Sequence, residues 1–440
     1  MSKKLYVTHC IDVEGPMTET VEATWDRMRE EDNIDLNIGA TKLNLEKFQN
    51  GELKLSSDTN HNEYLMKKYS KFNLGYLTNW QEIDQKINNV ISREFRSKLC
   101  DKLGNPYIYN WFIYDHYNFT TNPRFHDDGI HKIFDHYQKL HLDKNEFNDG
   151  IYWHYHHAPA SGDALEWSTN WFLNSGHEET LARRVIERKW FPSVFRAGGH
   201  IERNDINFWL EMFIPFDYSC RSSKTIDRDN AKGLVNDWRH APKEWTYYHP
   251  DFYDYRKKGN MNRYIFRSLD LKTWLLELSE EDVREAFERA NSGLPTVLSY
   301  YNHDYRDMLP EIQHGYNLIK KIENEYPEVD WQFSNCLDAA RKVLDMKDDQ
   351  KLEFKYSIKN NLLTIESNLE LFGPEPFLAI KENNIFFRDN TTKEGNKIWS
   401  YRFRKPSDVN AFGIAGNTKN GSTGIKIHSG KIVDTKSINY

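Results

Sequence analysis

Cysteines and long apolar runs are scarce in this chain, and their scarcity excludes several classes of protein. The 440 residues include only four cysteines, Cys10, Cys100, Cys220 and Cys336, which are widely spaced and form no Cys-x-x-Cys pair. Neither a disulfide framework nor a thiolate metal site fits this spacing. No apolar stretch reaches the roughly 18 residues of a membrane helix, and the run at 5–7 is too short for a secretory signal. We therefore expect a cytoplasmic protein with free thiols and no transmembrane segment.

An excess of charge of one sign is also absent. The formal net charge is −7, and lysine and arginine are spread along the chain rather than grouped in a basic stripe. This distribution argues against a nucleic-acid partner. Aromatic residues and histidines are instead abundant, at 14% of the chain and 17 residues respectively. Because most aromatic side chains in any protein lie in the core, this abundance only hints at a sugar-binding cleft, and homo-oligomerisation stays open.

Strand and helix patterns alternate through the first 346 residues. Short apolar runs typical of buried strands occur at 5–11, 109–114 and 295–301, and helical patterns lie between such runs, including a capping box that begins at Ser279. This alternation predicts a parallel sheet in an α/β fold, and the number of repeats predicts a distorted (β/α) barrel of about seven strands. The polar, turn-rich segment at about 15–78 is expected to be an insertion over the barrel mouth.

The pattern changes after residue 346. Segments such as 352–358 and 399–403 alternate between apolar and polar positions, with turn-forming residues between them. We therefore predict two domains, a barrel at 1–346 and a small antiparallel all-β domain at 347–440. The second domain is interpreted either as a glycan-binding module or as an element for packing or oligomerisation.

Four short segments place acidic, imidazole and guanidinium side chains at the ends of predicted strands. They are Thr8 to Gly15, which contains Asp12 and Glu14; Trp153 to His157, which contains His154 and His156; Phe195 to Gly199, which contains Arg196; and Leu298 to Asp304, which contains His303. In barrels of parallel strands the carboxyl ends of the strands carry the active site. We therefore expect these side chains to meet at one end of the barrel.

The acids and histidines have spacings that suit metal ligands. Asp12 and Glu14 are two residues apart, so both side chains face the same way if the strand continues. His154 and His156 share a face if their segment is extended, whereas His157 would join His154 if the segment is helical. Carboxylate and imidazole ligands suit zinc, iron or cobalt, and one such ion with an open position can promote amide hydrolysis. The alternative interpretations are that the acids merely end a strand and that the histidines form a solvated loop.

In this order, the four segments resemble the motifs of the polysaccharide deacetylase superfamily, in the branch whose third motif reads Arg-Ala-Gly-Gly. The resemblance covers the predicted barrel and leaves the C-terminal domain unexplained. It implies that Asp12 is the general base. It also implies that Glu14, His154 and His156 bind one divalent metal, expected to be zinc.

The same resemblance implies roles for two further groups. Arg196 would pair with the catalytic acid, and the glycines after it would let the backbone pass close to substrate or metal. His303 would protonate the leaving amine, with an acid elsewhere setting its tautomer. The sequence alone does not order the two acids Asp12 and Glu14. It also leaves open that Arg196 forms a surface ion pair and that His303 is a core histidine.

Two positions depart from the usual pattern of this family. Its histidine ligands are commonly four residues apart, whereas here the second imidazole is either His156 or His157. His200 stands where this branch usually has tryptophan, which leaves the substrate open. Asp115 ends another predicted strand and is expected to contact a ligand histidine or the substrate, as is the loop at 126–128. Because only neutral imidazoles bind metal, we expect occupancy to fall below about pH 6.

The predicted function is that of a metal-dependent hydrolase acting on a carbon–nitrogen bond outside peptides. By resemblance the substrate is an N-acylated amino sugar, an intermediate of surface polysaccharide such as lipopolysaccharide or capsule, from which an acetyl or formyl group is removed. One alternative is an amidase of a non-sugar small molecule on the same fold. A second is a catalytically inactive barrel that binds glycan or another protein.

Overall fold

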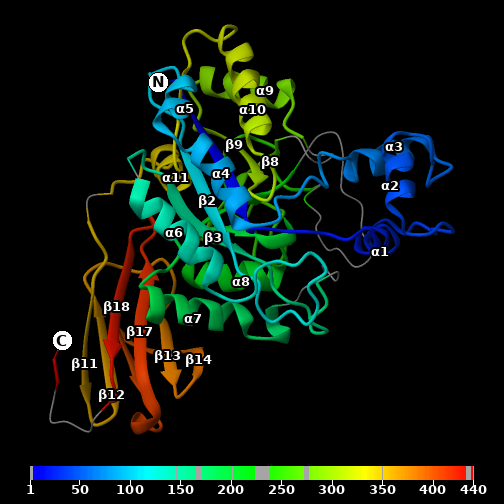
Figure 1. Ribbon diagram of the computed structural model, residues 1–440. Coiled ribbons are helices and arrows are strands. Elements are labelled where there is room, and N and C mark those ends of the chain that lie inside the picture. The colour runs from blue at the N-terminus through cyan, green and yellow to red at the C-terminus, as the bar shows by residue number, and fades with distance from the viewer. Residues whose placement is uncertain are drawn as a thin grey trace.

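The computed structural model describes most of the chain. The described residues are 3–144, 146–164, 171–200, 202–222, 238, 240–271, 277–348, 350–432 and 438–439. Within them the chain forms one large, mainly parallel sheet surrounded by helices, and two smaller antiparallel sheets near the C-terminus (Figure 1).

The large sheet is curled and has ten described strands. Their order is β6-β7-β5-β4-β3-β2-β1-β9-β8, and β10 also pairs with β1. All pairings are parallel except that of β6 with β7. The strands are β1 (Lys4–Val13), β2 (Tyr109–Tyr114), β3 (Gly150–Tyr155), β4 (Val194–Ala197), β5 (Phe216–Cys220), β6 (Tyr247–Tyr248), β7 (Tyr264–Arg267), β8 (Leu269–Asp270), β9 (Thr296–His303) and β10 (Asp330–Phe333).

The predicted α/β class with a separate set of β-strands is confirmed, but the predicted count of about seven strands in the barrel is wrong. The two-residue strands β6 and β8 are too short to leave a periodic pattern in the sequence. They are also the two ends of the strand order, and the described residues give no pairing between them.

Alternation along each strand decides which residues face the interior of the curl. On β1, Leu5, Val7 and Ile11 belong to the apolar cluster under the outer helices. Tyr6 and Cys10 belong to the cluster on the other, concave face. Because side chains alternate along a strand, Asp12 shares the concave face with Cys10, and it is completely buried.

Helices cover the convex face of the sheet. Four of them, α4, α6, α9 and α10, supply apolar residues to the cluster that also holds Leu5 and Val7. The predicted capping box is confirmed, because the side chains of Ser279 and Asp282 cap α9 reciprocally. The helices around the sheet are α4 (Trp80–Val90), α5 (Arg93–Lys98), α6 (Lys132–Lys144), α7 (Gly176–Arg188), α8 (Asn204–Phe213), α9 (Glu280–Asn291), α10 (Leu309–Glu323) and α11 (Cys336–Val343), with the short 3₁₀ turns η1 (Trp171–Leu173) and η2 (Gly198–His200).

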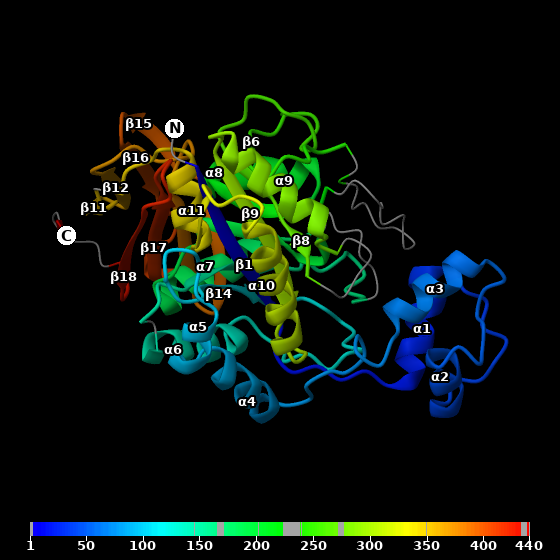
Figure 2. The same cartoon turned by 90° about the horizontal axis from the view of Figure 1, so that it is seen from above.

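The segment at 15–78 is more regular than its polar composition predicts. It contains α1 (Val21–Asp32), α2 (Lys42–Gln49) and α3 (Thr59–Lys68), which project away from the sheet beyond the end of β1 (Figure 2). The side chains of Thr20 and Asp58 cap α1 and α3. These helices bury a small apolar cluster of their own, Trp25, Met28, Ile34, Phe48, Leu65 and Tyr69. A few large apolar residues therefore suffice for this helical unit, although most of its sequence is polar.

The C-terminal strands form two antiparallel sheets that enclose their own apolar cluster. One sheet has the order β15-β16-β12-β11-β19 and the other β14-β13-β17-β18. The strands are β11 (Phe354–Lys359), β12 (Leu362–Ser367), β13 (Phe377–Glu382), β14 (Ile385–Asp389), β15 (Thr392–Gly395), β16 (Ile398–Arg402), β17 (Val409–Asn417), β18 (Thr423–Ser429) and β19 (Ile438–Asn439), with the turn η3 (Pro406–Asp408). A domain boundary at residue 346 stays a prediction.

The sheet that contains β13 and β17 also packs against α7 of the first part of the chain (Figure 1). Phe377 and Ala415 join Leu181 and Val185 in one apolar cluster. Gly413 allows the close approach, because a Cβ atom at that position would meet the side chain of Val185 at 2.5 Å. These strands therefore pack against the first part of the chain through α7.

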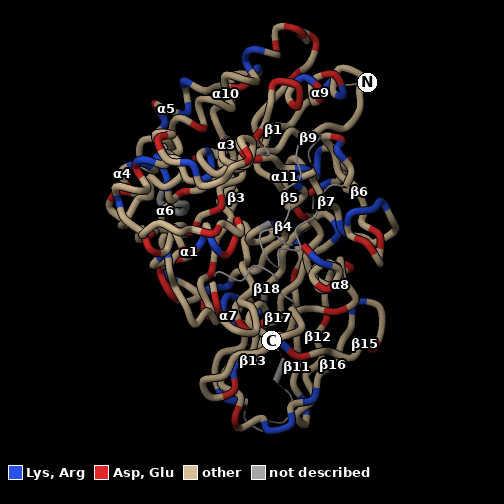
Figure 3. The backbone as a smooth tube through the Cα atoms, turned by 90° about the vertical axis from the view of Figure 1, so that its right-hand side faces the viewer, with Lys and Arg blue, Asp and Glu red and all other residues tan. Residues whose placement is uncertain are grey.

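Acidic and basic residues are interspersed along the described chain (Figure 3). Among the described residues, no helix combines the length and the apolar character that crossing a bilayer requires.

His9 makes the stability of the fold dependent on pH. It is fully buried on β1, with Nε2 2.9 Å from Oδ1 of Asn302 and Nδ1 3.0 Å from the hydroxyl of Tyr107. Burial lowers the pKa of His9 to about 3. Because the unfolded chain takes up this proton near pH 6.5 and the folded chain does not, folding stability is lost as the pH falls from about 6.5 toward 3.

We therefore predict that His9→Gln reduces the loss of unfolding free energy between pH 7.5 and 5 by about 2 kcal/mol. Urea unfolding at both pH values measures the unfolding free energy of each variant. The matched control is His61→Gln, at a partly buried position on α3, measured under the same conditions. An unchanged pH dependence in His9→Gln would contradict the buried, neutral state of this histidine.

Candidate metal centre

Five side chains from the ends of four strands meet at the carboxyl end of the sheet. Asp12 lies near the end of β1 and Glu14 directly follows it, while His154 lies on β3, Arg196 on β4 and His303 at the end of β9. β1 pairs with β9, and β3 pairs with β4, so their last residues lie at one edge. The parallel arrangement therefore brings together residues that are far apart in the sequence.

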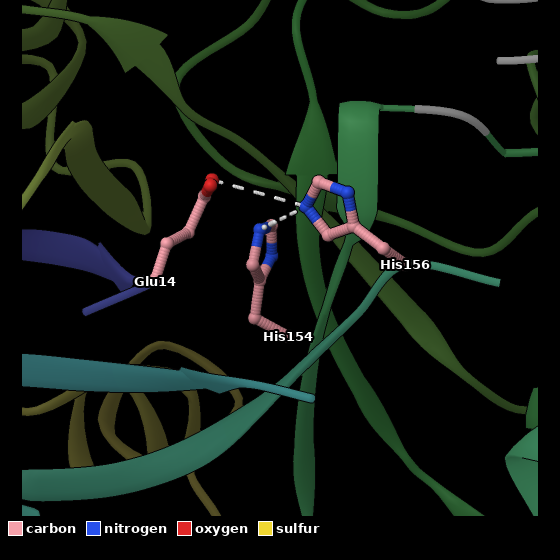
Figure 4. A group of neighbouring side chains, drawn as sticks. All are labelled: Glu14, His154 and His156. Atoms are coloured by element: carbon pink, nitrogen blue, oxygen red, sulfur yellow. Dashed lines mark hydrogen bonds and ion pairs between the residues drawn. The ribbon is translucent and has the colours of Figure 1, made fainter. Parts of the chain in front are cut away.

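Glu14, His154 and His156 form a compact group (Figure 4). Nε2 of His154 lies 3.0 Å from Nε2 of His156, which lies 3.9 Å from Oε1 of Glu14. One donor atom from each residue falls within 4.8 Å of the other two. The two imidazoles come from an extended segment and point to the same side, as expected for residues two apart.

Gly198 makes room for this arrangement. A Cβ atom at position 198 would collide with the ring of His156 and with the carbonyl oxygen of Tyr155. Gly199, which follows, has a φ of 56°, a left-handed conformation that favours glycine. Gly198 thus leaves space for the histidine segment, and Gly199 provides the left-handed backbone turn that follows.

The chemistry of these donors fits a divalent cation. Nδ1 of His154 lies 3.2 Å from the carbonyl oxygen of Arg196, so a proton on Nδ1 can be donated there. The tautomer with that proton leaves the lone pair of Nε2 directed at His156 and Glu14, which is the form a metal ligand needs. One carboxylate and two imidazoles suit zinc, iron or cobalt.

Burial changes the pH dependence that the sequence predicts for this group. It lowers the pKa of His154 to about 3, with a further contribution from the charge of Arg196. It also lowers the pKa of His156. Burial raises the pKa of Glu14 to about 8, and the charge of Arg124 opposes this rise. Deprotonation of Glu14, rather than of the imidazoles, is therefore expected to limit cation binding near neutral pH.

Asp12 and Arg196 form a fully buried ion pair beside this group. Nε of Arg196 lies 2.8 Å and 2.9 Å from the two carboxylate oxygens of Asp12. Arg196 also donates to the carbonyl oxygen of Tyr218 at 2.7 Å, and its guanidinium lies 3.7 Å from the ring centre of Tyr301. Burial raises the pKa of Asp12 while Arg196 opposes this shift. Arg196 thus fixes the direction of the Asp12 carboxylate within the site.

His303 lies between the two acids. Its Nε2 atom is 3.9 Å from Oδ2 of Asp12 and 3.8 Å from Oε1 of Glu14. The sequence analysis expects an acid elsewhere to set the tautomer of His303, yet its buried Nδ1 atom has no hydrogen-bond partner in the described part of the chain. Burial lowers the pKa of His303, and the charge of Arg306 adds to the effect. Burial thus disfavours the protonated form of His303.

Asp304, which follows His303 in the sequence, hydrogen-bonds to the backbone of the site rather than to the His303 ring. Its carboxylate accepts hydrogen bonds from the backbone N–H groups of Glu14 at 2.8 Å and Gly15 at 3.1 Å. It also accepts one from the hydroxyl of Tyr137 at 2.6 Å. These bonds hold the chain where β1 ends, which positions the side chain of Glu14.

Three of the candidate residues lie away from the group or outside the described structure. His157 turns to the other face, where it is buried beside the ring of Trp171. Asp115 is paired with Arg184, so its expected contact with a ligand histidine is not found among the described residues. The side chain of His200 lies outside the described part of the chain. Between His156 and His157, only His156 faces Glu14 and His154.

The structure also brings His126 close to Glu14. The sequence analysis names this histidine only as part of the loop at 126–128. Nε2 of His126 lies 3.7 Å from Oε2 of Glu14, and its ring lies against Tyr114. Arg124 and Arg306 also lie near Glu14, since the charges of both act on its carboxyl group. No spacing or motif in the sequence connects these three residues with Glu14, because contacts between loops leave no periodic pattern.

Comparisons with known proteins give only remote likenesses. No family model matches the chain, and no curated protein matches it. A solved structure of a candidate glycoside hydrolase/deacetylase from Parabacteroides distasonis is similar over 90% of this chain and 88% of its own, with 12% identity and a TM-score of 0.36. An endo-β-1,4-mannanase from Thermotoga petrophila is similar over 74% of this chain and 92% of its own, with 10% identity and a TM-score of 0.22. Both likenesses are too remote to indicate an activity.

Proposed function

We propose that the protein is a metal-dependent deacylase that removes an acetyl or formyl group from an N-acylated amino sugar. The observation that carries the proposal is the convergence of Glu14, His154 and His156 beside the buried Asp12–Arg196 pair. Metal-dependent hydrolysis of an amide uses a cation site with a base beside it, and these residues fit both roles. The resemblance of the motifs to polysaccharide deacetylases supports the same assignment.

The proposal gives each side chain one task. Glu14, His154 and His156 hold one divalent cation, expected to be zinc, which supplies an acidic water and a Lewis acid for the amide carbonyl. Asp12, held in place by Arg196, accepts the proton of the attacking water. His303 lies within 4 Å of both acids, a position from which it can pass a proton to the leaving nitrogen.

The substrate that we propose is an intermediate of surface polysaccharide synthesis, such as a sugar nucleotide or a lipid-linked sugar, rather than a cell-wall polymer. The support for it is the resemblance of the motifs to those of polysaccharide deacetylases. An amidase of a non-sugar compound is the principal alternative, because both reactions need the same groups.

A substrate panel separates these two activities. The zinc-reconstituted protein should be given N-acetylated and N-formylated amino sugars, their nucleotide-linked forms, and cyclic amides. We predict release of acetate or formate from at least one sugar at about 10-fold or more above any cyclic amide, since substrate-specific contacts of a few kcal/mol give such ratios. Chelation should abolish the release and zinc should restore it. Preference for a cyclic amide would favour the alternative, and release that survives chelation would contradict a metal-dependent reaction.

A further inference from the structure

Arg306 is a buried cation whose donors are not satisfied by the protein. It follows β9, and only 3% of its surface is exposed. Its Nε and Nη2 atoms are buried and have no hydrogen-bond partner in the described part of the chain. The guanidinium lies over the ring of Tyr305, with its carbon 4.7 Å from the ring centre. Buried guanidiniums in folded proteins are normally hydrogen-bonded, so the unpaired state of Arg306 requires an explanation.

Arg306 lies next to the candidate metal centre. The ring of Tyr305 lies 4.8 Å from the ring of His303, and Nε2 of His303 lies 3.8 Å from Oε1 of Glu14. A short series of contacts therefore connects the unpaired guanidinium with the proposed site. Glu311 and Asp270 offset the charge of Arg306 only from a distance.

Arg124 is a second cation whose charge acts on the site. Its backbone carbonyl accepts a hydrogen bond from the N–H of Thr18, which fixes the loop, but its guanidinium makes no ion pair with a described carboxylate. Its charge and that of Arg306 both act on Glu14 and on the Tyr305 hydroxyl. The charges of both guanidiniums thus reach the same two groups, the Glu14 carboxyl and the Tyr305 hydroxyl.

Guanidinium groups act on both acids of the described site. The charges of Arg196 and Arg221 act on Asp12, and those of Arg124 and Arg306 act on Glu14. Guanidinium groups bind carboxylates and phosphates through paired N–H donors, which is the arrangement that the free nitrogens of Arg306 can offer.

We propose that Arg306, assisted by Arg124, binds an oxyanion of the substrate, so that the substrate is an acidic N-acyl sugar whose phosphate or carboxylate group lies close to the amide. The inference rests on the proposed function and narrows its substrate class. The oxyanion replaces the hydrogen-bond partners that the protein does not provide. Arg306 is then a specificity-determining residue, because a neutral sugar leaves its donors unpaired.

Binding of three probes to the zinc-loaded, full-length protein tests the proposal. Calorimetry compares N-acetylglucosamine with its 1-phosphate and with an N-acetylhexosaminuronic acid, on the wild type, Arg306→Gln and Arg306→Lys. The control is Arg93→Gln, a change in an exposed arginine that pairs with Glu146. Zinc content is measured on every sample. The two acidic probes distinguish a phosphate from a carboxylate as the preferred oxyanion.

We expect one acidic sugar to bind the wild type about 10-fold or more tightly than the neutral sugar, the usual value of a charged hydrogen bond. Arg306→Gln should remove this difference with zinc content unchanged, Arg306→Lys should restore part of it, and Arg93→Gln should keep it. Ligand-free Arg306→Gln should also melt at a higher temperature than the wild type, because a buried unpaired charge is lost.

Equal binding of acidic and neutral sugars by the wild type would overturn the proposal. An acidic preference that Arg306→Gln retains would also overturn the proposal, because Arg306 would then not be the group that binds the oxyanion. Failure of the deacylase assignment has a different signature, since the acidic preference would persist in binding while no acyl group is released from any sugar.

Discussion

Asp12→Asn is expected to lower the turnover of the zinc-loaded protein by about 100-fold or more while its metal content stays at the wild-type level. Asn keeps the size of the side chain and can still accept a hydrogen bond from Arg196, whose Nε lies 2.8 Å from Oδ1 of Asp12. It cannot take up the proton of the attacking water. The rate should therefore fall without loss of the cation, and rate and element analysis on the same sample measure both quantities.

Asp135→Asn is a suitable control for this variant, because that carboxylate is exposed on α6, where it pairs with Arg188, and the change should leave rate and metal unchanged. If Asp12→Asn lost its metal while Glu14→Gln kept it, the two acids would have the opposite roles. An unaltered rate in Asp12→Asn would show that Asp12 is not the general base.

Glu14→Gln and His154→Ala are expected to abolish metal binding. Each removes one of three donors that lie within 4.8 Å of one another, so the affinity for zinc should fall by more than the roughly 10- to 100-fold typical of residues that only support a ligand. After dialysis these variants should hold no zinc above background. Turnover should then be lost together with the metal.

The neighbours His156 and His157 provide a matched pair for this prediction. His156 faces His154 and Glu14, whereas His157 is buried on the other face of the segment beside Trp171. His156→Gln should lose zinc, and His157→Gln should keep it even if the protein is less stable. If His157→Gln lost zinc while His156→Gln kept it, the segment would present its other face to the cation.

Local periodicity predicts which side chains share a face once the segment is known to be extended or helical. The alternation of β1 places Asp12 on the concave side with Cys10, and the extended segment at 154–156 brings His154 and His156 together. The capping box of α9 was also readable, because it depends on residues only three apart. These features are set by neighbours in the sequence.

Other parts of the site depend on contacts that no local pattern encodes. Asp304 holds the N–H of Glu14 from a position 290 residues away in the chain. Arg306 lies beside His303 in sequence, but its unpaired state follows only from the packing of several elements. The three helices at 15–78 were missed for a related reason, since their small apolar cluster is assembled from positions scattered over a mostly polar segment.

The most direct test of the account is element analysis of the wild-type protein, before and after chelation and reconstitution, with acyl release from the substrate panel assayed on the same samples. The account predicts about one zinc-like ion per chain, lost with activity on chelation and regained with it. No metal above background after reconstitution with zinc, iron or cobalt would contradict the account, because Glu14, His154 and His156 would then not form a cation site.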